Sequence, residues 1–135
     1  AREVAMRLIY QKDMSSSYSI GALEKMIESF RIDDNGVRYI DDIIYGVDKN
    51  IDQIDEYIKK HGKGWRFDRI SKVDLAILRV AVYELIWVDE IPYKVSINEA
   101  VELAKRYGSE TSSSFINGIL GSLVRSEPLL GDDMK

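Results

Sequence analysis

The sequence has 135 residues, of which 45% are hydrophobic, and this length suits one compact domain with its own core. Its formal net charge of −4 argues against a protein that coats nucleic acid by bulk charge, and the absence of cysteine excludes disulfides and thiolate metal sites. Since it contains neither an apolar run of about eighteen residues nor a signal-peptide pattern, we expect a cytoplasmic protein without membrane-spanning segments.

The first half of the chain has apolar residues at helical spacing, three or four positions apart. We expect the exposed side of the first helix to carry Arg2 and Arg7, the second helix to bury Phe30, and residues 33–36 to form a turn. The spacing predicts four helices, at Arg2–Met14, Ser19–Phe30, Val37–Val47 and Ile51–Lys60.

The segment from residue 73 to residue 88 is apolar at thirteen of its sixteen positions. A segment this long and this apolar predicts a central helix that is buried on most sides. Arg79 and Glu84 interrupt it five positions apart, which is not a facing spacing on a helix. We therefore expect each of them to pair with another helix.

A capping box follows Pro92, where Ser96 precedes Glu99 by three positions. In this motif the serine side chain accepts a hydrogen bond from the glutamate amide, and the glutamate side chain reaches back to the serine amide. The pattern predicts a helix that starts at Ile97, and it should stop at Gly108.

The last predicted helix spans Thr111–Val124, and Gly118 is expected to let two helices approach closely. The whole pattern predicts an all-α fold of about seven helices in two small helical bundles. The N-terminal bundle would comprise residues 1–60 and the C-terminal bundle residues 65–125, in one domain with a tail at 126–135.

Basic side chains gather in one segment of this acidic chain. Residues 59–72 carry six bases and one acid, whereas acids outnumber bases ten to four between residues 24 and 56. Trp65 and Phe67 lie among the bases, an arrangement typical of a track that binds phosphates and stacks bases. The alternative, which we favour, is that Trp65 anchors its loop to the core.

Several linked blocks of the sequence stand out by their order and spacing. They are Trp65, Val73–Leu85, Ile91–Lys105, Tyr107–Gly108 and Phe115–Leu120. These blocks resemble the NusB family of bacterial transcription antitermination factors, and weaker matches near residues 1–11 and 45–55 extend the resemblance over most of the chain. The resemblance implies an all-α fold and a role in RNA binding rather than in catalysis.

The resemblance also implies partners and site residues. Family members bind the boxA segment of nascent RNA, usually as heterodimers with a small-subunit ribosomal protein that acts as NusE. Together they seed the RNA polymerase antitermination complex on ribosomal RNA operons, and no cofactor is implied. The RNA side of the family maps to Arg2, Tyr10 and Phe115, and the NusE-facing side maps to Asp74.

Arg7 and Ser114 complete the predicted RNA site, and both depart from the family pattern. Glutamine is common at the position of Arg7, and the arginine could add a phosphate contact. Lysine is common at the position of Ser114, so the serine removes one phosphate partner. Family members also carry arginines before the position of Ala1, so some of the RNA-binding residues are expected to lie outside this sequence.

Purely structural roles for these residues, and other functions for the chain, are alternatives to this interpretation. The RNA residues could be an ordinary helix face or core packing, and Asp74 could simply favour a helix N-terminus. The chain could be a protein-interaction module, either a NusB-like domain of an RNA methyltransferase or a homodimer that hides its RNA face. A metalloenzyme would need four aspartates to converge on a cation, at Asp41, Asp42, Asp48 and Asp52.

An enzyme is not expected. His61 is the only histidine, and the sequence shows no nucleophile elbow, phosphate-binding glycine loop or metal-ligand pair.

Overall fold

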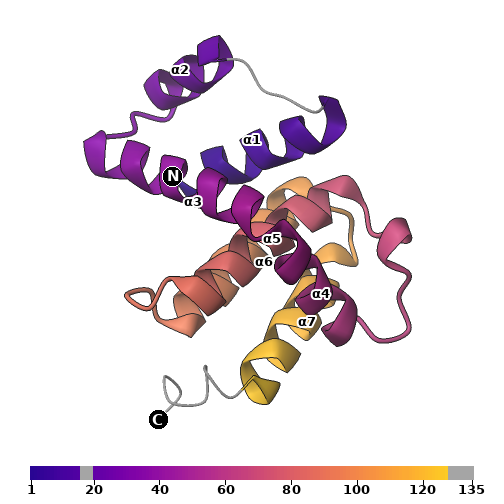
Figure 1. Ribbon diagram of the computed structural model, residues 1–135. Helices are drawn as coiled ribbons and strands as arrows, with labels where there is room; N and C mark the ends of the chain where they lie inside the picture. Colours follow the sequence, from indigo (N-terminus) through magenta and orange to yellow (C-terminus); the bar gives the residue numbers. More distant parts are fainter. Residues whose placement is uncertain (16–19, 128–135) are drawn as a thin grey trace.

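The computed structural model describes residues 1–15 and 20–127, and within these ranges it contains helices and no strand (Figure 1). The predicted all-α fold with seven α-helices is confirmed. No helix in the described part of the chain is both long and apolar enough to cross a membrane. The helices are α1 (Arg2–Ser15), α2 (Ile20–Ser29), α3 (Asp34–Lys49), α4 (Ile51–His61), the short 3₁₀ helix η1 (Phe67–Arg69), α5 (Lys72–Trp87), α6 (Tyr93–Tyr107) and α7 (Ser112–Ser126).

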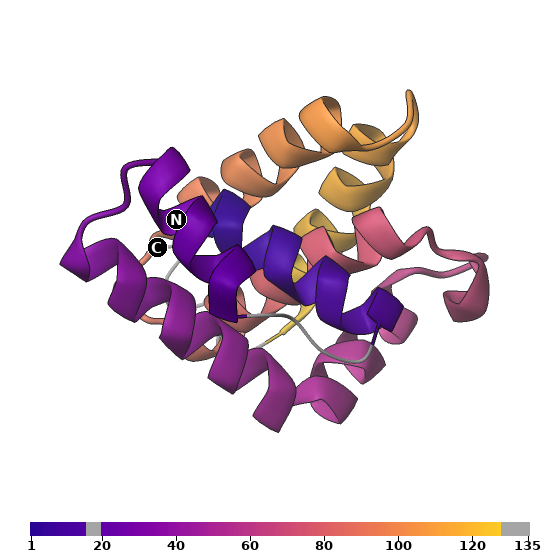
Figure 2. The ribbon, with the colours of Figure 1, turned by 90° about the horizontal axis from the view of Figure 1, so that it is seen from above.

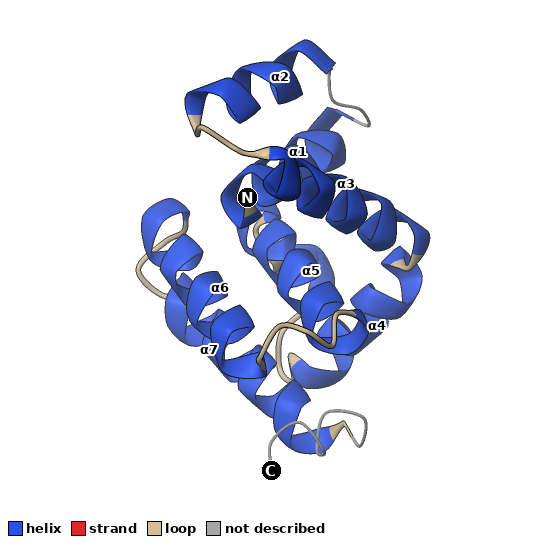
Figure 3. Ribbon diagram, turned by 90° about the vertical axis from the view of Figure 1, so that its left-hand side faces the viewer, coloured by secondary structure: helices blue, strands red, loops and turns tan. Residues whose placement is uncertain are grey.

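Helix α5 lies at the centre of the molecule, as predicted. It packs against α1, α3, α4, α6 and α7, and Figure 3 shows it between α6 and α7 on one side and α3 and α4 on the other. Seen from above, α1 crosses the middle of the molecule, with α3 and α6 on opposite sides (Figure 2). Ten of the residues of α5 are buried, and burying an aliphatic side chain contributes about 1.5–3 kcal/mol. This helix therefore joins the two halves of the chain.

Helix α2 lies outermost, beyond α1 and α3 (Figure 1). Leu23 and Met26 are partly buried against a small separate cluster made by Val4, Leu8 and Ile40. The prediction that this segment buries Phe30 was wrong, because the ring lies after the end of the helix and is 38% exposed. The guanidinium carbon of Arg7 lies 5.8 Å from its centroid.

Side-chain caps set the start of two helices. Asp33 Oδ1 accepts a hydrogen bond from the Gly36 amide at 2.8 Å, so α3 begins at Asp34, where a turn was predicted. Aspartate and glycine favour both turns and helix caps, which is why the sequence pattern was ambiguous. In the same way, Ser71 Oγ accepts from the Asp74 amide at 3.1 Å at the start of α5.

Helix α6 begins at Tyr93, before the predicted start. Pro92 occupies the N-cap position with φ −59°, close to the value that suits the beginning of a helix. Ser96 is therefore already helical and is 2% exposed, and its hydroxyl donates to Glu84 Oε1 at 2.7 Å. The prediction of a capping box was therefore wrong. Ser96 has the residue type and spacing of a helix cap, but in the folded protein its hydroxyl binds Glu84 of α5.

The close helix approach expected at Gly118 is also wrong. This residue is exposed, and a Cβ built on it would meet no atom within 4 Å in the described part of the chain. The close contact is at Gly46 of α3, where a Cβ would overlap the ring of Tyr83 of α5. A glycine inside a helix is compatible with either environment, so the sequence alone did not distinguish them.

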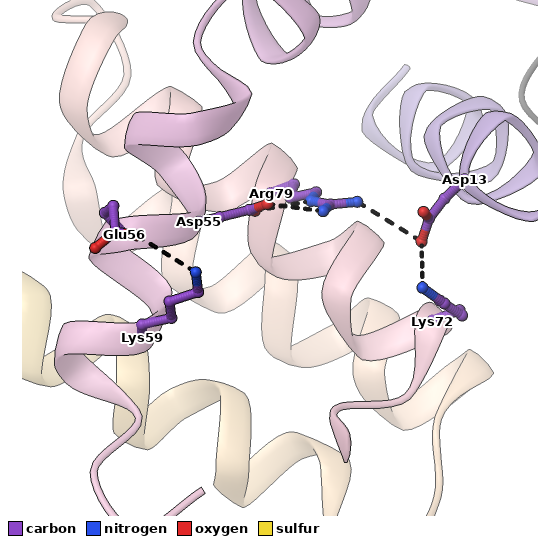
Figure 4. A network of polar contacts seen from close by, with 6 residues as sticks. All are labelled: Asp13, Asp55, Glu56, Lys59, Lys72 and Arg79. Atoms are coloured by element: carbon purple, nitrogen blue, oxygen red, sulfur yellow. Dashed lines mark hydrogen bonds and ion pairs between the residues drawn. The ribbon is translucent and has the colours of Figure 1, made fainter. Parts of the chain in front are cut away.

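Charged residues of α5 pair with other helices, as predicted. Arg79 donates to Asp55 of α4 through Nε and Nη2, at 3.0 and 2.9 Å (Figure 4). Its Nη1 lies 3.6 Å from the Asp13 carboxylate of α1, which also lies 3.5 Å from Lys72 Nζ. Because Arg79 is only 11% exposed, this network fixes α1 and α4 against the central helix.

Candidate nucleic-acid interface

Three adjoining hollows form a continuous surface, which we call the Tyr10–Phe115 face. The first hollow, of about 620 Å³, contains Tyr10 and extends to Val73 and Tyr107. The second, of about 350 Å³, shares these last two residues and extends to Trp65 and Phe115. The third, of about 410 Å³, shares Trp65 and Phe115. The shared walls bring the C-terminal part of α1 and the end of α6 together with the first turns of α5 and α7.

The first hollow holds two of the predicted RNA residues. Tyr10 is half-buried in its wall, and Arg7 is exposed at its edge. Gln11 Oε1 is buried there without a hydrogen-bond partner among the described residues. A ring and a guanidinium beside open space can stack a base and bind a phosphate. The remaining wall is rich in methionine, with Met6, Met14 and Met26.

Tyr107 separates the first hollow from the second, and the sequence did not single it out as a site residue. Its hydroxyl donates to Glu3 Oε2, and the other oxygen of that carboxylate accepts from Arg106. Burial, together with the hydrogen bond to Glu3, raises the pKa of Tyr107 above its ordinary value of 10. The phenol is therefore neutral near pH 7. Its place in the Tyr107–Gly108 block was the one signal in the sequence.

The second hollow places Asp74 beside Phe115. Asp74 is 8% exposed, and its Oδ1 has no hydrogen-bond partner in the described part of the chain. A buried polar atom without a partner costs free energy, so this oxygen favours a donor or a cation supplied from outside. We expected Asp74 to lie on a face separate from the RNA residues, and the structure instead puts it in the same hollow as one of them, Phe115.

Phe115 lies in the first turn of α7, where it packs against Trp65. The two ring centroids are 4.6 Å apart and the ring planes are inclined by 55°. Trp65 is 59% exposed, so the expectation that it anchors its loop to the core was wrong. His61, four positions before Trp65, anchors the start of the loop, because its ring hydrogen-bonds to Glu127 and to Ser122 of α7. Ser114 is exposed beside Phe115 in the third hollow.

Most of the basic segment at 59–72 is already paired with acids. Lys63 and Arg69 are exposed and form no ion pair with any residue in the ranges described. Lys63 lines the third hollow and Arg69 the second, so both lie near Trp65. The pairs are Lys59 with Glu56 at 3.3 Å, Lys60 with Glu127 at 3.0 Å, Arg66 with Asp68 at 2.9 Å and Lys72 with Asp13 at 3.5 Å.

Arg2 lines none of the three hollows. It lies eight residues before Tyr10, about 12 Å along the axis of α1 at 1.5 Å per residue. Its Nε donates to both carboxylate oxygens of Glu84, at 3.0 and 2.8 Å. Burial by itself would lower the pKa of Arg2, but the Glu84 carboxylate raises it above its ordinary value. The side chain is 25% exposed, so Arg2 is not the freely exposed cation that its helix position indicated.

The four aspartates considered as cation ligands do not form a metal site. No group of three histidine, aspartate or glutamate side chains in the described residues is placed to hold a metal ion. Asp48 pairs with Lys12 at 2.7 Å, and Asp41, Asp42 and Asp52 are exposed. The Tyr10–Phe115 face offers aromatic rings, cations and one carboxylate, which suits binding of an unpaired strand.

Comparisons with known proteins agree with this description. The model of the NusB family matches residues 1–125. The transcription antitermination protein NusB of Acetivibrio thermocellus is 48% identical over 132 residues, covering 98% of this chain and 91% of the relative. The protein of the same name from Clostridium botulinum strain Kyoto is 45% identical, with 92% and 96% covered.

Solved structures show the same fold. The structure of T. maritima NusB superimposes with a TM-score of 0.82 at 32% identity, covering 93% of this chain and 89% of that chain. The NusB fold in a crystal structure of antitermination factors NusB and NusE in complex with dsRNA gives a TM-score of 0.81 at 24% identity, with 93% and 94% covered.

Proposed function

Because this chain belongs to the NusB family, we propose that it acts in transcription antitermination by binding boxA-type single-stranded RNA together with the ribosomal protein NusE. It is an RNA-binding antitermination factor, and the matches cover 91% and 96% of the length of these two relatives. We infer that it works in the bacterial cytoplasm, within the RNA polymerase antitermination complex and without catalysis or a cofactor.

The observation that carries the proposal is the juxtaposition of rings and cations on the Tyr10–Phe115 face. Tyr10 and Phe115 line hollows that share Tyr107, although they belong to the first and last helices. Arg7 supplies an exposed cation at one end, and Ser114 an exposed hydroxyl at the other. Sequence-specific proteins read single-stranded RNA by stacking unpaired bases and contacting phosphates. Arg2 contributes indirectly, by fixing the start of α1 through Glu84.

The partner would bind at Asp74. Its unpaired, buried Oδ1 is an acceptor for a lysine or arginine of NusE, and charge-assisted hydrogen bonds are stronger than neutral ones. Since Phe115 lines the same hollow, NusE and RNA would meet there. If NusE strengthens RNA binding there, RNA must strengthen NusE binding by the same factor, because coupling between binding sites is reciprocal.

The test is the affinity for a boxA-type strand and a scrambled strand, with and without NusE, at two salt concentrations. We expect a preference for boxA that NusE increases and that salt weakens. Equal, weak binding to both strands in every mixture would contradict the proposal. If instead the free protein is a dimer and binds RNA only on dilution to monomer, the face is masked by a second copy.

A further inference from the structure

Trp65 is the more exposed of the two tryptophans in the chain. Trp87 is partly buried and stacks on Tyr83 with centroids 5.5 Å apart and an interplanar angle of 16°. Trp65 packs on Phe115 and is otherwise 59% exposed. Leaving a large indole in water is unfavourable, and exposed apolar surface beside a hollow commonly marks a binding site.

Backbone contacts hold the loop that presents this indole. The Gly62 amide donates to Ile58 O at 2.9 Å and ends α4, and the Trp65 amide donates to Gly62 O at 3.0 Å. Gly64 has φ +83°, in the region that favours glycine. The loop is therefore ordered before any ligand binds, which lowers the cost of binding.

His61 ties the start of this loop to the end of α7. Its Nδ1 lies 2.9 Å from Ser122 Oγ, and its Nε2 lies 2.9 Å from Glu127 Oε2. The His61 side chain is 4% exposed. Since Phe115 is on α7 and Trp65 is on the loop, this contact sets the position of one ring relative to the other.

The third hollow lies next to the rings of Trp65 and Phe115, and there is free space in it above Gly118. Its volume of about 410 Å³ is within the range of about 300–1,000 Å³ typical of ligand pockets. Gly118 lies in its lining, and a Cβ there would meet no atom of residues 1–15 or 20–127 within 4 Å. A planar group could therefore enter without displacing the protein.

The charge around the hollow favours a polyanion. Lys63 and Arg69 are exposed near Trp65 and have no acidic partner in the ranges described. Their charges are available for phosphates, and phosphate binding depends on such free cations. An apolar peptide would gain nothing from them.

We propose that Trp65 is a further RNA-binding residue, which stacks an unpaired base over the third hollow while Lys63 and Arg69 contact the neighbouring phosphates. This inference rests on the proposed function and adds one ring and two cations to the RNA site. Bases on Tyr10, Phe115 and Trp65 would then follow one strand from the first hollow to the third. Base stacking on aromatic side chains tolerates any base, so Trp65 should add affinity more than sequence preference.

The first experiment compares Trp65→Ala and Trp65→Phe in the full chain by fluorescence anisotropy of a labelled boxA-type strand. We expect about tenfold weaker binding for Trp65→Ala, the effect of losing one stacked base, and less than about threefold for Trp65→Phe. Thermal unfolding should be unchanged in both, since the indole is mostly exposed. Unchanged affinity of Trp65→Ala for a strand that the unsubstituted protein binds would overturn this inference and leave the proposed function intact. Failure of the unsubstituted protein to bind any strand would overturn both.

The second experiment leaves Trp65 in place and uses it as the probe. In a Trp87→Phe variant, Trp65 is the sole tryptophan, and stacking of a base should quench its emission during titration with the strand. Binding detected by anisotropy without any change in emission would contradict the inference. A change in emission with NusE and none with RNA would assign Trp65 to the protein partner instead, and would equally contradict it.

The third experiment fills the hollow. Gly118→Leu places a side chain in its free space and should weaken RNA binding about as much as Trp65→Ala. Gly21→Leu is the matched control, because Gly21 is also exposed and helical and has no neighbour within 4 Å among the described residues, but it lies on α2. Equal affinities of these two variants would show that the third hollow is not used.

Discussion

Glu84 of α5 accepts two hydrogen bonds from Nε of Arg2 in α1, at 3.0 and 2.8 Å, although 82 positions separate them in the sequence. The same carboxylate accepts from the hydroxyls of Ser96 and Tyr39, and it is 1% exposed. Burial, together with the charge of Glu84, raises the pKa of Tyr39 above its ordinary value of 10. Four helices, α1, α3, α5 and α6, therefore meet at one buried charge.

Replacing Glu84 by alanine should lower the free energy of unfolding by about 3–5 kcal/mol, because Arg2 and two hydroxyls would lose a buried partner. Asp48→Ala is the control, since it removes an exposed pair with Lys12 that should contribute about 0–1 kcal/mol. Urea unfolding followed by circular dichroism measures both. Similar small losses would show that the Glu84 contacts do not stabilise the fold.

Arg2 and Arg7 should differ in what their removal affects. Arg2→Ala should destabilise the fold by about 2 kcal/mol, less than a fully buried pair because Arg2 is 25% exposed. Arg7→Ala should change stability by less than about 1 kcal/mol, the usual value of an exposed cation–π contact such as that with Phe30. Arg7→Ala should instead weaken RNA binding roughly fivefold, as expected for one phosphate contact. If Arg2→Ala loses RNA affinity without losing stability, Arg2 is a direct RNA ligand.

Tyr10→Asp and Phe115→Asp should weaken RNA binding by more than about tenfold, because they remove a stacking ring and add charge repulsion. Binding of NusE by itself should change little. Anisotropy with labelled RNA and calorimetry with NusE measure the two separately. If these variants fail to fold by circular dichroism, Tyr10→Leu and Phe115→Leu keep the apolar volume and test stacking alone.

Asp74→Asn should weaken NusE binding and leave direct RNA binding intact, because it removes the charge while keeping the size of the side chain. A change to lysine is less specific, since Asp74 and Phe115 line one hollow and a buried cation there would disturb both ligands. Calorimetry with NusE measures the effect. Unchanged NusE affinity would show that the unpaired Oδ1 is not the partner site.

Glu127 should make stability depend on acid pH. Burial by itself would raise the pKa of Glu127, but hydrogen bonds from Lys60 and His61 outweigh it and hold the pKa below its ordinary value of 4.5. A carboxyl with a lowered pKa contributes stability above pH 4.5 and loses it as the pH falls through the lowered value. Glu127→Gln should therefore be less stable than the unsubstituted protein at pH 7, and the difference should shrink below pH 4.5. A difference that is constant with pH would contradict this.

Much of the fold followed from local patterns in the sequence. The apolar spacing predicted seven helices, and thirteen apolar positions in residues 73–88 predicted the buried central helix. The five-residue spacing of Arg79 and Glu84 predicted that each would pair with another helix, because such residues do not face each other on one helix. The linked blocks from Trp65 to Leu120 indicated the family.

The tertiary structure decided which of these residues meet. The sequence pattern predicted that Ser96 caps a helix, but its hydroxyl donates to Glu84. The pattern also predicted a close helix contact at Gly118, but a Cβ there would meet no described atom within 4 Å. We predicted that Trp65 anchors its loop to the core, but the side chain is exposed and packs on Phe115. Both rings line the hollow that also contains Asp74. Apolar periodicity and residue spacing in the sequence indicate only which residues are neighbours within about one or two turns of the same helix. Contacts between helices depend on how all their surfaces pack together, and the candidate RNA site consists of such contacts.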